Sequence, residues 1–499
     1  MNEHILSEFR DLVKKIKSYE EALAVMYWDL RTGAPKKGVE TRSEVIGVLS
    51  TEMFKLSISS EMGSYLEELS QVDQFESLDE MNQKLVIECK KEYERSVKIP
   101  PEMYQEYVVL TSQAESIWED AKRASDFAMF QPYLEKIVTF NQRFVELWGY
   151  EGHKYNTLLD MYEPGVTIDQ LDEVFGELRK HTVPLVHNLK DDPKKLDTSF
   201  LKQQFDVSKQ KEFSLFILKQ LGYDFEAGRL DESEHPFATG LNPGDVRITT
   251  KFKPSDIAFA LFGTIHECGH ALYEQNISPN LIGTPLCNGA SMGIHESQSR
   301  FWEIYIGSSL PFWKRYYRDL QQHFPLQLDG ISVEQFYQAI NQAQPSLIRI
   351  EADELTYNLH IMIRYELEKG LIGGDIQVAD LPRLWNEKYE QYLGVTPSHD
   401  GEGVLQDVHW AGGAFGYFPS YSLGNMYGAQ MIHTLRQQLP NLDTLVEQGD
   451  FRLIKEWLAE KVHRFGKLLT PAEIIQHVSG EELNPDYLIR HLKSKYSRS

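Results

Sequence analysis

The sequence predicts a mainly α-helical protein with a short β-segment beside a metal-binding helix. Three observations support this. Apolar residues recur at spacings of three and four over residues 5–23, as on one face of an amphipathic helix. Residues 245–252 alternate in the manner of a strand, and a histidine pair, His266 and His270, follows at the spacing of one helical turn. We therefore expect stacked helices over the first 230 residues and the functional site after them.

Amphipathic helical spacing continues along the N-terminal part of the chain. It recurs over residues 77–96, 102–124, 129–150, 168–189 and 208–221. The outer faces of these segments are rich in Glu and Lys, which is typical of solvated helix surfaces. With 499 residues, of which 41% are hydrophobic, the chain can bury a large core. Its length is compatible with two or three domains or with one elongated helical domain.

Charge and cysteine content limit the partners and the compartment. The net charge of −23 argues against nucleic acid and against an anionic membrane surface. The first ten residues lack the basic and apolar regions of a secretory signal, and no apolar run is long enough to span a membrane. Three cysteines, Cys89, Cys268 and Cys287, cannot form a disulfide framework. We expect a cytoplasmic protein.

The helical pattern is interrupted between residues 228 and 253, where prolines and glycines accumulate. Residues 245–252 are expected to form a strand. A strand just before the metal helix could offer a free edge to an extended peptide, which would give backbone hydrogen bonds without reading sequence. The alternative is a short β-hairpin that packs on the helices. Both remain open at this point.

Residues 264–273 contain the pattern H-E-x-x-H within an apolar, helix-compatible segment. In a helix, His266 and His270 lie on one face and can hold one metal ion together. Glu267 lies about 100° round the helix, within reach of a water on the metal, which is the position of a general base. The alternative is a pair of core histidines. Cys268 lies on the far side of the helix, where core packing is expected.

A third ligand is expected from the segment after the metal helix. A loop over residues 276–293 and a helix over residues 295–310 would return the chain to the metal. Glu296 completes a set of two histidines and one carboxylate, which suits catalytic zinc. The neighbouring His295 is the rival, but consecutive helical residues diverge by about 100°, so only one of them can face the metal. We favour Glu296, with His295 beside a ligand or facing the substrate.

Two further segments carry candidate substrate contacts. Residues 403–421 are glycine-rich and supply His409, Tyr417 and Tyr421 as donors to a developing oxyanion, although aromatic residues beside glycines also often simply pack. The guanidinium of Arg349 suits a substrate's terminal carboxylate. The alternative for Arg349 is a helical ion pair with Asp353, four residues further on. The rest of the C-terminal third is expected to be helical, with a capping box at residues 470–473 that starts a helix.

Six motifs in order resemble the M32 family of metallocarboxypeptidases, of the bacillus type. The motifs are His235-Pro236-Phe237, Asp245-x-Arg247-x-Thr249, His266-Glu267-x-x-His270, His295-Glu296-Ser297-Gln298, Ile348-Arg349-x-x-Ala352-Asp353 and Gly403-x-x-Gln406-Asp407-x-His409-Trp410. The resemblance implies one elongated, clam-like helical domain over residues 1–499, of the gluzincin type and distantly similar to neurolysin and angiotensin-converting enzyme. Residues 1–230 would wall a deep substrate groove, and residues 231–499 would carry the motifs and a small sheet near the metal.

The resemblance also implies roles for individual residues. One divalent metal per subunit, zinc in the first place with cobalt or manganese as alternatives, would be held by His266, His270 and Glu296. Glu267 would be the general base, Arg349 would bind the C-terminal carboxylate, and His409 with Tyr421 or Tyr417 would stabilise the oxyanion. His235, Arg247 and His295 would contact the substrate. These three complete the implied substrate-binding set.

The expected activity is the removal of C-terminal amino acids from peptides with a free C-terminus, with broad specificity excluding proline, by a homodimer. One alternative is an endo-acting metallo-oligopeptidase, in which Arg349 would be only structural. An alternative of another class is a non-catalytic helical peptide-binding protein with a structural metal, for which Glu267 would have no chemical role.

Overall fold

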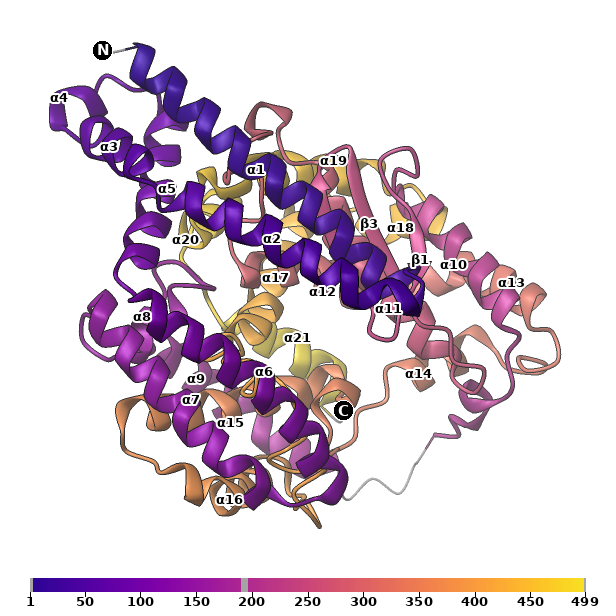
Figure 1. The fold of residues 1–499 in the computed structure, drawn as a ribbon. Helices are drawn as coiled ribbons and strands as arrows, with labels where there is room; N and C mark the ends of the chain where they lie inside the picture. The colour runs from indigo at the N-terminus through magenta and orange to yellow at the C-terminus, as the bar shows by residue number, and fades with distance from the viewer. Residues whose placement is uncertain (1–2, 190–195, 498–499) are drawn as a thin grey trace.

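The computed structural model describes residues 3–189 and 196–497 of the chain (Figure 1). Its N-terminal part is a succession of helices, as the sequence predicts. They are α1 (Glu3–Thr32), α2 (Val39–Ser57), α3 (Ser60–Leu69), α4 (Val72–Phe75), α5 (Glu80–Val97), α6 (Pro101–Ala124), α7 (Phe127–Trp148), α8 (Tyr155–Leu159), α9 (Ile168–Leu189) and α10 (Val207–Leu221). Several begin at a side-chain cap, such as Ser59 of α3 and Asp79 of α5, each of which accepts a hydrogen bond from a backbone N–H of the first turn.

All the amphipathic segments predicted in this part are helices. Their ends differ by a few residues, except that α1 continues nine residues beyond residue 23. The helix α2 was not predicted as a separate element, because Ile46 is its only buried residue and its apolar periodicity is correspondingly weak. It lies beside α1 along much of its length (Figure 1). No helix within residues 3–189 and 196–497 combines the length and apolar character needed to cross a membrane.

The β-segment is a three-stranded sheet of β1 (Leu230–Glu232), β2 (Ala238–Asn242) and β3 (Asp245–Thr250), in the order β1-β3-β2. The strand predicted over residues 245–252 is therefore β3, which pairs parallel with β1 and antiparallel with β2. The hypothesis that it offers a free edge to a peptide is wrong, because both of its edges carry hydrogen bonds within the sheet. The hairpin alternative, β2 with β3, is what forms.

The C-terminal part is again mainly helical. Its helices are α11 (Ile257–Gln275), α12 (Met292–Arg300), α13 (Leu310–His323), α14 (Val333–Ile340), α15 (Glu354–Gly373), α16 (Leu381–Leu393), α17 (Pro419–Gln438), α18 (Leu442–Gln448), α19 (Arg452–Lys461), α20 (Pro471–Ser479) and α21 (Asp486–Tyr496). The capping box predicted at the start of α20 is present: the Thr470 side chain accepts from the Glu473 backbone and the Glu473 side chain from the Thr470 backbone. The predicted fold class, mainly α with a small sheet near the metal-binding helix, is confirmed.

The helix predicted over residues 295–310 differs in the structure. The α-helical part, α12, ends at Arg300 and is followed by a π-helix, η4 (Phe301–Gly307). A new helix, α13, starts at Leu310 because the Ser309 side chain caps it and Pro311 occupies its first turn. A π-helix holds one more residue in each turn than an α-helix, which changes the direction in which the following side chains point.

Two glycines allow the helices that carry the site to approach closely. A Cβ atom at Gly269 of α11 would lie 2.4 Å from the backbone oxygen of Gln298, and one at Gly424 of α17 would lie 2.7 Å from the Cβ of Glu296. The helix α12 is thus held between α11 and α17 at distances that only glycine permits. Buried apolar residues from α1 to α21 form one continuous cluster around these central helices. The single domain over residues 1–499 and its division at residue 230 stay predictions; both ends of that range lie outside the described residues.

Replacing Gly269 by alanine is expected to lower the melting temperature and to weaken metal binding. The added methyl group meets backbone atoms of α12, which cannot turn away as a flexible side chain can, and such overpacking costs about 1–3 kcal/mol. Thermal unfolding and metal titration would measure both effects. Gly263→Ala is a matched control on the same helix, because nothing lies within 4 Å of its Cβ position. A Gly269→Ala protein as stable as the control would contradict the close packing.

Candidate active site

His266, His270 and Glu296 converge as the sequence predicts. The histidines lie on successive turns of α11, and Glu296 comes from the middle of α12. The Glu296 Oε2 atom lies 3.6 Å from His266 Nε2 and 3.5 Å from His270 Nε2, and one ligand atom from each of the three residues lies within 4.8 Å of the others. Two imidazoles and one carboxylate are the protein ligands of catalytic zinc, with a position left for water. The donor set fits a divalent ion.

Each histidine of this group is oriented from behind by a second side chain. The Nδ1 atom of His266 lies 2.8 Å from Glu303 Oε2, and Glu303 in turn accepts from Arg300 at 2.7 Å. A carboxylate at Nδ1 favours the tautomer that leaves the Nε2 lone pair free for a metal. Glu303 was not predicted. It lies seven residues after Glu296 but inside the π-helix, so α-helical spacing alone does not place it beside His266.

His295 orients the second histidine. Its Nδ1 atom lies 2.6 Å from His270 Nδ1, and its Nε2 atom lies 2.7 Å from Glu274 Oε1. His295 therefore lies beside the ligand His270, which is one of the two positions that the sequence predicts for it. Its contact with substrate stays a prediction. Glu274, near the end of α11, was not predicted, because its role depends on the turn that brings α12 back to α11.

The charges of the metal-ligand residues shift one another's pKa values. Burial alone would raise the pKa of Glu296, but the neighbouring histidines lower it to about 2, so this carboxylate is ionised as a ligand must be. Burial alone would lower the pKa of His266, but Glu296 and Glu303 raise it to about 9. A metal ion that binds His266 must therefore release a proton from it.

Glu267 is buried, with 7% of its surface exposed, and does not belong to the group of converging ligand atoms. Burial raises its pKa to about 7, while the charge of His266 acts in the opposite direction. A carboxyl group with a pKa near neutrality is well matched to proton transfer, and a bound cation nearby would lower this pKa again. Cys268 is fully buried, as expected for core packing.

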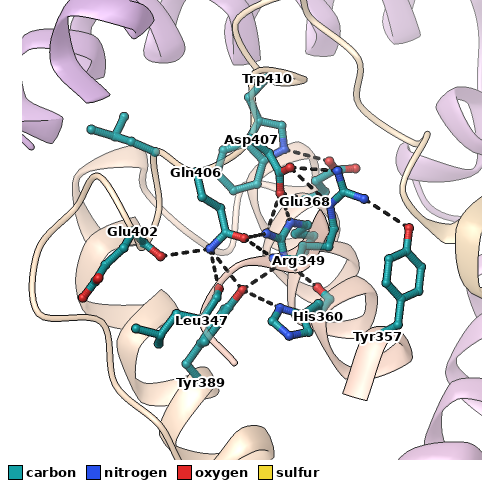
Figure 2. A network of polar contacts seen from close by, with 12 residues as sticks. Leu347, Arg349, Tyr357, His360, Glu368, Tyr389, Glu402, Gln406, Asp407 and Trp410 are labelled. Atoms are coloured by element: carbon teal, nitrogen blue, oxygen red, sulfur yellow. Dashed lines mark hydrogen bonds and ion pairs between the residues drawn. The ribbon is translucent and has the colours of Figure 1, made fainter. Parts of the chain in front are cut away.

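Arg349 lies in a short 3-10 turn, η5 (Arg349–Glu351), and only 7% of its side chain is exposed. Its Nε and Nη2 atoms donate to Asp407 at 2.9–3.2 Å, and its Nη1 atom donates to the hydroxyl of Tyr357 at 3.1 Å (Figure 2). The alternative of a helical ion pair with Asp353 is wrong. Asp353 instead caps α15 by accepting from the backbone of Leu355 and Thr356.

His409, Tyr417 and Tyr421 gather in one aromatic cluster. The His409 ring lies 5.6 Å from that of Tyr417, which lies 5.1 Å from that of Tyr421. Burial lowers the pKa of His409 to about 4, so its imidazole is neutral, and its buried Nδ1 atom has no hydrogen-bond partner among the described residues. Burial and, to a smaller extent, the charge of Glu296 raise the pKa of Tyr417. The cluster thus lies within electrostatic reach of the metal ligands.

The sequence as a whole matches one protein family. A profile described as Carboxypeptidase Taq (M32) metallopeptidase covers residues 8–496. The chain belongs to the M32 family. Carboxypeptidase 1 of Bacillus subtilis is 54% identical over 490 residues, which are 98% of this chain and 97% of that protein. Thermostable carboxypeptidase 1 of Thermus thermophilus is 39% identical over 95% of this chain and 94% of that protein. The crystal structure of an M32 carboxypeptidase from Deinococcus radiodurans superimposes with a TM-score of 0.94 at 34% identity and covers 99% of both chains.

The M32 chain is a metallocarboxypeptidase. Two of its motifs lie on the sheet and in the segment between β1 and β2, beside Trp28 of α1. Arg247 on β3 donates to Asp245 at 2.7 and 2.8 Å, and its guanidinium lies 5.7 Å from the ring centroid of Trp28 on α1. Phe237 packs on the same Trp28 ring at 5.3 Å. His235 is exposed in the segment between β1 and β2. The roles of His235 and Arg247 in substrate binding stay predictions.

The segment that carries His409 is anchored in this M32 protein by a buried carboxylate that the sequence did not reveal. Glu368 on α15 is fully buried and accepts from Trp410 Nε1 at 2.7 Å, from the backbone of Gly416 at 2.9 Å and from Tyr155 at 2.6 Å (Figure 2 shows Trp410 and Glu368). Gly416 has φ of 90° and passes close to the backbone of Leu158, where a Cβ atom would clash. Both sides of the turn between His409 and Tyr417 are therefore fixed to α15.

Proposed function

We propose that this protein removes the C-terminal amino acid from peptides by metal-assisted hydrolysis, with one divalent ion held by His266, His270 and Glu296. The observation that supports the proposal is that the same site contains this ligand group and a buried Arg349 whose guanidinium is held in place by hydrogen bonds. Tyr357 connects the two: its hydroxyl accepts from Arg349, and the Arg300 guanidinium beside the ligands lies 5.4 Å from its ring centroid. A site for hydrolysis next to a site for a carboxylate defines an exopeptidase.

When bound, the divalent ion supplies Lewis acidity and lowers the pKa of a water that it holds. Glu267 accepts the proton of the attacking water at its carboxylate and later delivers it to the amine of the departing amino acid. Its burial supports this, because burial raises the pKa of the carboxyl group while the bound ion lowers it, which keeps a group that can both accept and return a proton. The outer contacts from Glu303 and His295 keep the two imidazoles in the orientation that the reaction needs.

Arg349 binds the C-terminal carboxylate of the peptide, and His409 with Tyr421 or Tyr417 donates to the oxyanion that forms at the scissile carbonyl. His409 is half-buried and its imidazole is neutral, so it can donate one N–H to the substrate, which supports this role. The Arg349 guanidinium lies 5.1 Å from the Tyr421 ring centroid, so the carboxylate and oxyanion contacts are neighbours. His235, Arg247 and His295 complete the proposed set of substrate contacts.

Zinc is the proposed metal, with cobalt or manganese as alternatives, because two imidazoles and a carboxylate suit all three. The broad specificity that excludes proline, the deep groove and the homodimer are carried over from the resemblance to the family. A reducing compartment such as the cytoplasm suits the three free cysteines among the described residues.

The test compares a blocked dipeptide with a free C-terminus and the same dipeptide as its C-terminal amide. Protein stripped with a chelator is assayed before and after addition of zinc, cobalt or manganese. We expect metal-restored release of the terminal amino acid from the free acid and little or no cleavage of the amide. Equal cleavage of acid and amide, or cleavage within longer peptides, would favour the endo-acting oligopeptidase. Metal binding without any hydrolysis would favour the peptide-binding protein.

A further inference from the structure

A second guanidinium lies behind Arg349, outside every motif that the sequence singled out. Arg364 on α15 is fully buried. Its Nε and Nη2 atoms lie 2.7 and 2.5 Å from Asp407 Oδ2. Its Nη1 atom donates to the backbone carbonyl of His360 at 2.8 Å. With no exposed surface, Arg364 cannot touch a substrate. It shares its carboxylate partner with Arg349, whose side chain does reach the surface.

The two arginines are held by the same pair of residues. The Oε1 atom of Gln406 accepts from the backbone N–H of Arg349 at 2.9 Å and from the Nη2 atom of Arg364 at 2.7 Å. The adjacent Asp407 accepts from both guanidinium groups (Figure 2 shows Gln406 and Asp407 beside Arg349). Any change at Arg364 therefore reaches Arg349 through contacts that both arginines make.

The charges in this group do not balance. Among the described residues, Asp407 is the only carboxylate that forms an ion pair with either guanidinium. Burial alone would raise the pKa of Asp407, but Arg364 and then Arg349 hold it well below its usual range, so the two arginines and their shared ion-pair partner are two cations and one anion. The buried Glu368 lies within electrostatic range of Arg364, but it accepts its hydrogen bonds from Trp410, Gly416 and Tyr155. Lys122 of α6 adds further positive charge nearby and bonds the backbone carbonyl of Gln406 rather than Asp407. A buried excess of positive charge needs an anion, and a substrate carboxylate supplies one.

We propose that Arg364 is a positioning residue for the C-terminal carboxylate of the substrate. It compensates the charge of Asp407 from the buried side, so that Arg349 is oriented by Asp407 without being neutralised by it. The preference of the enzyme for a free carboxylate over an amide thus depends on a residue that never meets the substrate. This inference rests on the proposed role of Arg349 in the reaction.

If Arg364 served only the fold, its replacement would have different effects on stability and on kinetics. If it only packed against the loop, its loss would lower the stability and would reduce the rates on acid and amide substrates together. If its charge is what matters, its loss raises KM for the free acid and leaves the amide unaffected, because the amide carries no charge for Arg349 to bind. The removal of Asp407 as well should then restore the positive charge at Arg349.

The test uses the full-length, metal-loaded protein and four variants: Arg364→Met, Arg364→Lys, Arg364→Met combined with Asp407→Asn, and the control Arg179→Met. Arg179 also pairs with a carboxylate of α15, Glu366, but its hydrogen-bond partners among the described residues, Glu366 and Tyr392, are not those of Arg349. The measurements are kcat and KM for a blocked dipeptide as free acid and as amide, inhibition by the free product amino acid, and the melting temperature of each protein. Where amide hydrolysis is too slow, inhibition by the amide replaces it.

We expect Arg364→Met to raise KM for the free acid and to reduce the preference for acid over amide by about tenfold or more. The double variant regains at least part of that preference, and the control matches the wild type. Arg364→Lys keeps the charge but loses the two-point contact with Asp407, so it retains more of the preference than Arg364→Met and less than the wild type. A folded Arg364→Met protein with the wild-type preference would overturn the proposal, as would a double variant that regains none. If Arg364→Met does not fold, the double variant, which lacks both the Arg364 cation and the Asp407 anion, must keep the preference for the proposal to stand.

The same data separate this inference from the function on which it rests. If the wild type hydrolyses the acid and the amide equally well, Arg349 does not bind the substrate carboxylate. Arg364 then has no carboxylate-binding residue to position. A wild type that prefers the acid, together with an Arg364→Met protein that does so equally, would leave the proposed function intact and assign Arg364 to the fold alone.

Discussion

Replacing Glu267 by glutamine is expected to lower kcat by about a hundred- to ten-thousand-fold while the metal stays bound. Glutamine has nearly the same shape as glutamate but cannot take a proton from water. Because Glu267 does not belong to the converging ligand group, its replacement leaves the metal affinity close to that of the wild type. Steady-state kinetics on a blocked dipeptide, with the metal content measured in the same samples, would test this.

Glu303→Gln provides the contrasting control. It is the same chemical change at a carboxylate that contacts the ligand His266, so it should weaken metal binding by about 10- to 100-fold and leave kcat of the fully loaded enzyme within a few-fold. The two variants therefore separate proton transfer from metal retention. A Glu267→Gln protein that retains the wild-type kcat with a full metal complement would exclude Glu267 as the general base.

Arg349→Met is expected to lower kcat/KM for free-acid peptides by roughly 30-fold to several thousand-fold, which corresponds to about 2–5 kcal/mol for a buried charge contact. The fold should survive, because Arg364 still compensates Asp407 when Arg349 is gone. Hydrolysis or inhibition constants for the amide should change little. Kinetics on an acid and amide pair would measure the effect.

Arg452→Met is a suitable control for the loss of an arginine, since this residue is exposed on α19 and pairs only with Glu456 within the described part of the chain. It should leave both substrates unaffected. Equal losses on acid and amide in Arg349→Met would mean that Arg349 supports the structure of the site rather than the substrate carboxylate. That outcome would favour the endo-acting alternative.

The metal ligands could be predicted from sequence because their geometry is local. Helical spacing alone brings His266 and His270 to one face, and a return helix brings Glu296 to them. The three ligand atoms do converge in the structure. The amphipathic helices were predicted for the same reason, since burial of one face leaves a regular pattern in the sequence.

The contacts that failed to be predicted depend on segments distant in the chain. The partner of Arg349 is Asp407, 58 residues away, and not the nearby Asp353. The free edge expected for β3 is covered by β1, which pairs with it in parallel although β2 lies between them in the sequence. Neither pairing leaves a periodic signal in the sequence. The π-helix after Arg300 and the outer contacts from Glu303 and Glu274 were missed because they follow from how α12 returns to α11.

The π-helix has a consequence for the comparison of relatives. The contact between Glu303 and His266 requires the present number of residues between Glu296 and Glu303, because each residue in the wider turn shifts the direction of those that follow. A homologue that had lost one residue from this stretch would keep the H-E-x-x-H pattern and Glu296 in perfect alignment. It would nonetheless hold its metal with an unsupported imidazole. Transfer of metal affinity between relatives should therefore be judged on the length of this segment as well as on the ligand motif.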